Sequence, residues 1–482
     1  MPVRLINAIP LKHLTTLLLL SFFLISCGSG NVQSATATAD TTATPIYDES
    51  LPKGRVADSI ACKDGSQDFA LYLPVHYSPA QAYPCIYFFD PHGHGGLPLR
   101  MYKELAEQYG FVLVGSNASK NGMQWQVTNN AAQALMADTK SRINIDPKRV
   151  YAAGFSGGSR VASSVALMDG GIAGVIGCGA GFPNGGASAT SRFDYFGMVG
   201  DQDFNLIEMR QLDSTLEQNN FDHELIVFSG KHAWAPVADF HTALLWMQVH
   251  AIKEHLQPKG DALVAALKSD YEKRLAAATT ANDLVKVNGL LYSMIQTLGG
   301  LTDVAPEQKR LADLAAGNAF KKAAYTQYIL QQNELQQQQQ FAKHFTALDD
   351  KWWTKKTAQL EHDADGGKTP DELISRRLLN YLGLVSYMSS NHAIQENDMP
   401  NAELYLKVFR MADPQNPDQC YLTAQYYIKK GDSMQAVASL KEAAVLGFSD
   451  VSQLLSDPAF AGLQSDAGYQ EVVKKVRANA VK

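Results

Sequence analysis

Between residues 68 and 230, short apolar runs alternate with longer stretches in which apolar positions recur every three or four residues. Runs that are apolar throughout are typical of strands buried on both faces, and stretches such as "LRMYKELAEQYG" are typical of amphipathic helices. Strands that alternate with helices indicate an α/β fold with a doubly wound, mostly parallel sheet. The expected strands are residues 68–74, 84–90, 111–117, 150–155, 174–181, 195–200 and 224–230.

After residue 256 the pattern changes to helical spacing without a convincing strand run. We therefore predict an α/β domain over residues 49–256 and an all-helical region over residues 257–380. The glutamine-rich stretch at 329–345 keeps apolar residues at roughly helical spacing, so we expect a helix with a polar face there.

Two segments near the end of the chain superpose 34 residues apart, so that Ala402 matches Ala436 and Leu406 matches Leu440. Small residues at this period, followed by a proline-marked turn, resemble tetratricopeptide repeats. The resemblance implies a repeat-like array over residues 381–482 that offers a surface to a protein partner. The alternative is a generic helical bundle.

The first 27 residues have the pattern of a targeting segment, with basic residues before an apolar run that is short for a membrane span. The run ends in "LISC", which resembles the lipobox of bacterial lipoproteins. The resemblance implies a signal peptide over residues 1–27 and a lipid anchor on Cys27, which would hold the protein in the bacterial cell envelope, at the outer membrane. Residues 28–48 are small and polar, as in a flexible tether. A cleaved secretory signal with an incidental cysteine is the alternative.

Composition narrows the class of function. The chain of 482 residues has a formal net charge of −6, and this absence of a basic excess excludes nucleic acid as the expected partner. The cysteine spacing matches neither a metal site nor a dense disulfide framework. A Cys62–Cys85 bridge and buried free thiols both remain open.

Ser156 lies in the sequence "GFSGGS", directly after an expected strand and at the start of an expected helix. A strand-to-helix turn this tight strains its central residue and leaves room only for small neighbours, which accounts for Gly154 and Gly158. This arrangement is the nucleophile elbow of α/β-hydrolases. A serine that merely caps the helix would explain Ser156 but not both glycines.

An activated serine needs a base and an orienting acid, which follow it in the order acid, then histidine in this fold. Among the downstream histidines, only His232 lies just past the end of an expected strand. The preceding loop, "MVGDQDFN", offers Asp201 and Asp203. We predict Asp203 as the acid because it lies far enough into the loop to reach His232.

An oxyanion that forms during acyl transfer needs backbone N–H donors. Gly157, the residue after the nucleophile, supplies one, and we expect the others from Gly93, His94 and Gly95 in "FFDPHGHGG". Trp125 is a candidate wall for stacking against the substrate, with an ordinary, partly buried aromatic residue as the alternative.

The same loop offers a competing interpretation, in which Asp90, His92 and His94 bind a metal ion. No further ligand follows at a useful spacing, so we expect neither a metal nor a cofactor.

Four stretches, "YPCIYFFDPHGHGG", "GFVLVGSNASKNG", "NIDPKRVYAAGFSGGS" and "SGKHAW", look like secreted esterases of the polyhydroxyalkanoate-depolymerase and feruloyl-esterase type. The resemblance covers about residues 58–248. It implies hydrolysis of a small or polymeric carboxylic ester, with Ser156 as nucleophile, His232 as base and Asp203 as its orienting acid. The oxyanion loop departs from the family by starting with Asp-Pro-His. A serine peptidase of the prolyl-oligopeptidase type and a non-catalytic scaffold lipoprotein are the rival hypotheses.

Overall fold

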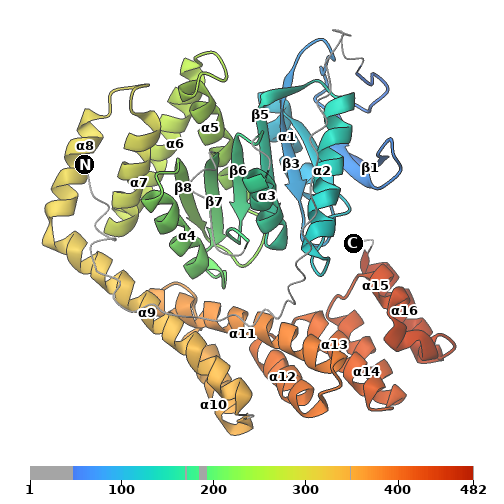
Figure 1. Ribbon diagram of the computed structural model, residues 1–482. Helices are drawn as coiled ribbons and strands as arrows, with labels where there is room; N and C mark the ends of the chain where they lie inside the picture. The colour runs from blue at the N-terminus through green and yellow to red at the C-terminus, as the bar shows by residue number, and fades with distance from the viewer. Residues whose placement is uncertain (1–46, 169–170, 184–192, 348, 481–482) are drawn as a thin grey trace, which may run out of the picture.

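The structure is a computed structural model that describes residues 47–480, apart from 169–170, 184–192 and 348 (Figure 1). The predicted signal peptide, Cys27 and nearly all of the predicted tether lie outside the described residues. None of the helices in the described part of the chain is long and apolar enough to cross a membrane.

A single eight-stranded sheet forms the centre of the first half of the chain, in the order β1-β2-β4-β3-β5-β6-β7-β8. Every pairing from β4 to β8 is parallel, and β1 and β2 extend the sheet with antiparallel pairings. All seven expected strands are present, which confirms the predicted fold class. The strands are β1 (Ala57–Ala61), β2 (Asp68–Tyr72), β3 (Tyr83–Phe89), β4 (Val112–Ser116), β5 (Ile145–Phe155), β6 (Gly174–Cys178), β7 (Asp194–Gly200) and β8 (His223–Phe228).

Helices cover both faces of this sheet, because successive residues of each buried strand point to opposite sides. In β3, Ile86 and Phe88 join the apolar cluster under α1 and α5, whereas Tyr87 and Phe89 join the cluster under α2, α3 and α4. The five helices are α1 (Gly96–Tyr109), α2 (Trp125–Arg142), α3 (Gly157–Met168), α4 (Leu206–Gln218) and α5 (Val237–Lys253).

The predicted boundary at residue 256 does not coincide with a break in the core. Trp246 of α5 belongs to the same buried cluster as Leu267, Tyr271 and Leu291, which lie on the two helices that follow. A second layer of helices is therefore packed onto α5. This layer consists of α6 (Asp261–Thr280), α7 (Leu284–Leu298) and α8 (Ala305–Ala316).

The remaining helices form an all-helical region with its own apolar clusters. The glutamine-rich stretch is helical, as predicted, and its Phe341 packs near Trp353. Figure 1 shows this region below the sheet. Its elements are α9 (Asn318–Thr346), α10 (Asp350–Asp363), α11 (Pro370–Gln395), α12 (Met399–Ala412), α13 (Pro417–Lys429), α14 (Ser433–Val445), α15 (Val451–Ser456), the 3₁₀-helix η2 (Pro458–Leu463) and α16 (Ala467–Ala480).

The predicted boundary between residues 380 and 381 is corrected, because it falls in the middle of α11. This helix begins at a capping box in which Thr369 and Glu372 satisfy each other's backbone N–H groups, with Pro370 at the first helical position. It then continues without a break through Gly383. The repeat-like segment therefore has no separate start at residue 381.

Consecutive helices of this segment pack in pairs, α11 with α12 and α13 with α14. The residues matched at the 34-residue period, Ala402 with Ala436, are both fully buried. Asp398 and Asp432, also 34 residues apart, both cap a helix by accepting a backbone N–H three residues ahead. The period seen in the sequence thus corresponds to a repeated helix start.

Four cysteines lie in the described part of the chain, and all four are buried free thiols, so Cys62 and Cys85 form no bridge. Burial raises the pKa of the Cys62 thiol to about 11, and that of the Cys178 and Cys420 thiols to about 12. These side chains therefore act as small apolar core residues rather than as reactive thiolates.

Candidate active site

The backbone at Ser156 is strained, with φ of 53°, a left-handed conformation that non-glycine residues rarely adopt. Ser156 follows the last residue of β5, and its N–H donates to the carbonyl of Cys178 at 2.9 Å. A Cβ at Gly154 would come within 2.1 Å of the Gly158 carbonyl oxygen, and one at Gly158 within 1.9 Å of the Phe89 carbonyl oxygen. Both flanking glycines are therefore required by the close approach of three chain segments.

The structure brings Ser156, His232 and Asp203 together at the carboxyl edge of the sheet. The Ser156 Oγ lies 2.9 Å from His232 Nε2, and His232 Nδ1 lies 2.8 Å from Asp203 Oδ2. Because Nδ1 faces a carboxylate, it carries the hydrogen, which leaves Nε2 to accept from the serine hydroxyl. The other Asp203 oxygen accepts the N–H of Asn205 at 2.8 Å. His232 Nε2 can therefore accept the proton of the Ser156 hydroxyl.

Packing fixes the positions of this histidine and its carboxylate. The His232 ring contacts the rings of Phe155 and Phe204, with centroid separations of 4.6 and 4.3 Å. The Asp203 carboxylate is fully buried. Gly179 has φ of 65°, and a Cβ there would lie only 3.0 Å from Asp203 Oδ2. The glycine leaves room for the hydrogen bond between Asp203 and His232.

Asp201, the other aspartate of the same loop, points to a different partner. Its carboxylate accepts the N–H of Gly230 at 3.0 Å, and its own N–H donates to the Phe228 carbonyl at 2.8 Å. Asp201 therefore ties the end of β7 to the turn after β8, and Asp203 is the aspartate that meets His232.

Asp90, the first residue of the loop after β3, makes hydrogen bonds within this loop and to a second loop. Its carboxylate is 2% exposed and accepts the N–H groups of His92 at 2.9 Å and His94 at 3.4 Å. Its second oxygen accepts Trp234 Nε1–H at 2.9 Å. Asp90 thus joins this loop to the loop that carries His232, and sequence reasoning had considered it only as a metal ligand.

Two of the three loop N–H groups predicted as oxyanion donors already have good acceptors. The Gly93 N–H donates to the Asp90 carbonyl, and the Gly95 N–H donates to Asn117 Oδ1, both at 3.1 Å. The His94 N–H, at 3.4 Å from Asp90 Oδ1, has the longest of these bonds. His94 is therefore the residue of this loop whose N–H is most available to a ligand.

Asn121 is a neighbour of the site that sequence reasoning missed. Gly157 begins α3, where backbone N–H groups lack intrahelical acceptors, and a Cβ on Gly157 would come within 1.8 Å of Asn121 Oδ1. The Asn121 N–H donates to the Pro91 carbonyl at 2.8 Å. Trp125 begins α2, four residues further on, and is 43% exposed.

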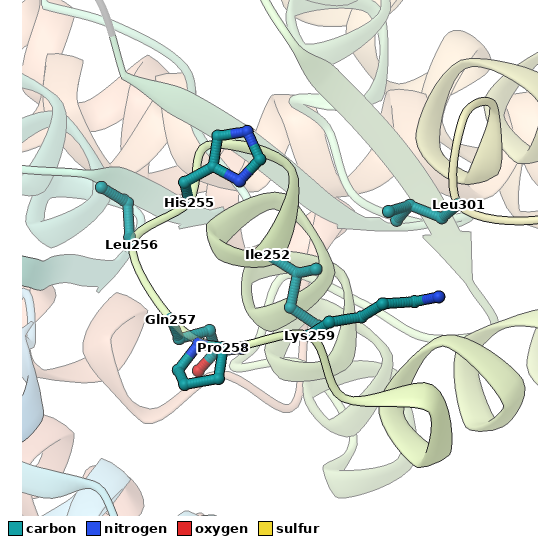
Figure 2. A pocket seen from close by; sticks show the side chains of 7 residues that line it. All are labelled: Ile252, His255, Leu256, Gln257, Pro258, Lys259 and Leu301. Carbon is teal, nitrogen blue, oxygen red and sulfur yellow. The ribbon is translucent and has the colours of Figure 1, made fainter.

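A recess of about 470 Å³ and a cluster of metal-ligand residues both lie at the opposite edge of the sheet. Figure 2 shows the recess, whose lining includes Ile252 and Lys259 near the end of α5. Asp194, Asp222 and His250 offer ligand atoms within 4.8 Å of one another, at the starts of β7 and β8 and near the end of α5. Neither feature belongs to the site around Ser156.

No protein-family model and no curated protein matches this chain. Several solved structures are similar to about two fifths of this chain. A fluorophosphonate-binding serine hydrolase of Staphylococcus aureus is 14% identical, with 38% of this chain and 92% of that chain covered and a TM-score of 0.32. An S-formylglutathione hydrolase of the same species is 13% identical, with 40% and 99% covered and a TM-score of 0.34. A feruloyl esterase module from Clostridium thermocellum is 12% identical, with 42% and 93% covered and a TM-score of 0.34.

Proposed function

We propose that this chain is a serine hydrolase that cleaves carboxylic esters through an acyl-enzyme intermediate. The observation that carries the proposal is the pair of contacts at His232, 2.9 Å to Ser156 Oγ and 2.8 Å to Asp203 Oδ2. Ser156 attacks the ester carbonyl while His232 takes its proton and passes it to the leaving alcohol. A water molecule then attacks the acyl-enzyme with His232 again as base, and Ser156 is released.

Two backbone N–H groups are placed to stabilise the negative charge on the carbonyl oxygen. We assign them to Gly157, at the start of α3, and to His94, whose N–H makes only the long bond to Asp90 among the described residues. The N–H groups of Gly93 and Gly95 instead stabilise the loop, because they donate to the Asp90 carbonyl and to Asn117 Oδ1. Removing one such donor from a hydrolase typically costs about 10²- to 10³-fold in turnover.

Assays of the full chain with two kinds of substrate distinguish an esterase from a peptidase. We expect p-nitrophenyl esters to be hydrolysed and aminoacyl-p-nitroanilides to be left intact, with a fluorophosphonate probe labelling Ser156. Faster cleavage of the anilides would favour a peptidase of the prolyl-oligopeptidase type. Failure to react with either substrate or with the probe would contradict the hydrolase proposal and favour a scaffold lipoprotein.

A lipid anchor on Cys27 is the second part of the proposal, and it rests on the "LISC" sequence. Acyl chains on this cysteine would hold the enzyme at the outer membrane through the tether of residues 28–48. We expect Cys27→Ser to move the protein from the membrane fraction to a soluble or unprocessed form, as measured by fractionation and mass spectrometry of the N-terminus. Unchanged membrane association of the Cys27→Ser protein would contradict the anchor.

We also infer that α11 to α14 are two tetratricopeptide-like repeats. The shared 34-residue spacing of Asp398 and Asp432, and of the buried Ala402 and Ala436, supports this. Arrays of this kind stack helix pairs and present an extended surface to a protein partner.

A further inference from the structure

Helix α11 of the all-helical region contacts the loop that carries Asp203. Arg377 Nη1–H donates to the carbonyl of Asp201, and Asn380 Nδ2–H donates to the carbonyl of Gln202, both at 2.7 Å. These two residues directly precede Asp203 in the chain, and more than 170 residues separate them from α11. The catalytic loop and the helical region are therefore joined by direct bonds.

A buried partner holds the Arg377 side chain in the orientation that this contact needs. Its Nε–H and Nη2–H donate to the two carboxylate oxygens of Glu334, on α9, at 2.9 and 2.6 Å. Arg377 is 7% exposed and Glu334 2% exposed. A two-pronged pair of this kind fixes the plane of the guanidinium and leaves Nη1 directed at the Asp201 carbonyl.

The peptide units that lead to Asp203 are thus held from two sides. On one side, the N–H groups of Asp201 and Gln202 donate to the carbonyls of Phe228 and Gly230 at 2.8 and 2.9 Å. On the other side, the carbonyls of the same two residues accept from α11. Only the second set of bonds comes from outside the α/β half of the chain.

One carboxyl group of the helical region lies within electrostatic range of the loop after β3. Asp418 lies in the first turn of α13. Burial raises the pKa of its carboxyl, and the nearby imidazole of His92 opposes that rise. The helical region is therefore bonded to the acid loop, and Asp418 lies near the loop after β3 without a direct bond to it among the described residues.

We propose that α11 is a positioning element of the active site, in which Arg377 and Asn380 hold the acid loop so that Asp203 stays bonded to His232. This inference rests on the proposed function. It makes turnover dependent on the placement of α11, and a partner that shifted the helical region would change activity without contacting the substrate.

The test is a double-mutant cycle on the full chain, with a small p-nitrophenyl ester as substrate. Asn380→Ala removes one bond without leaving a buried charge, and Arg377→Gln with Glu334→Gln removes the other while keeping the buried pair neutral. We expect kcat to fall by about 10- to 100-fold with little change in KM, as small misplacements of catalytic groups do. Arg410→Gln, which breaks an exposed ion pair within the same helical region, should leave kcat unchanged.

The same substitutions are then made in an Asp203→Ala background. If Arg377 and Asn380 act through Asp203, their substitution should lower kcat no further in this background, because the effects of residues that work as a unit are not additive. Full activity of both variants, or an equal loss with and without Asp203, would overturn the positioning role. If instead Asp203→Ala and Ser156→Ala leave activity intact, the proposed function itself has failed.

Discussion

Replacing Ser156 with alanine should lower kcat/KM for every ester that the chain cleaves by about 10⁴-fold or more, with little change in melting temperature. The substitution removes the only oxygen that lies at hydrogen-bond distance from His232 Nε2 among the described residues. Alanine tolerates the left-handed conformation at this position about as well as serine does, so the turn should persist. Turnover of a p-nitrophenyl ester, labelling by a fluorophosphonate and circular dichroism together measure the effect.

Ser163 offers a matched control on the same helix. It is buried, and its hydroxyl has no hydrogen-bond partner among the described residues, so Ser163→Ala should keep full activity. Near-normal turnover by a folded Ser156→Ala protein would contradict the serine-hydrolase proposal.

Replacing Asp203 with asparagine should reduce kcat by roughly 10⁴-fold, as this change does in a well-studied serine protease. Asparagine keeps the shape and the bond to the Asn205 N–H, but it would present an amide N–H to His232 Nδ1. The imidazole would then carry its hydrogen on Nε2 and could no longer accept the serine proton. The melting temperature should change little, since the amide has the same size as the carboxylate and can keep hydrogen bonds to the Asn205 N–H and to His232 Nδ1.

Asp201→Asn provides the paired control for this change. Its side-chain oxygen can still accept the Gly230 N–H, so the turn after β7 should survive and most activity should remain. The two variants are compared by their kcat values on the same ester. A larger loss in Asp201→Asn than in Asp203→Asn would contradict the assignment of the acid.

The apolar runs were sufficient to predict β2 to β8, because strands covered on both faces need apolar residues throughout and the edge strand β8 still buries every second residue. β1 escaped notice because it is an edge strand whose residues, "ADSIA", are mostly half-buried or exposed. The positions of Ser156, His232 and Asp203 also followed from the sequence. All three lie just past strand ends, and the carboxyl ends of parallel strands meet at one edge.

The bonds around these residues could not be predicted in the same way. Whether a backbone N–H in the Gly93–Gly95 loop is free depends on where Asp90 and Asn117 lie in space. The contact between α11 and the acid loop is even harder to predict from the sequence. Helical periodicity shows that one face of a helix is buried, but it does not show which segment covers that face. The sequence did contain one indication that this face of α11 has a polar partner. Arg377 lies between the buried Ile374 and Leu378, on the apolar side of its helix.

The apolar cluster shared by the sheet and α5 to α8 has a consequence for how the molecule opens. Backbone amides of α6 and α7 should exchange with solvent through the same rare unfolding event as the central strands, because they belong to one cooperative unit. The last helices, α13 to α16, have a cluster of their own and can open at lower cost. In terms of cooperative units, the first part of the protein therefore extends to Gly317, at the start of α9, and a shortened chain meant to keep this unit folded should retain every residue up to that point.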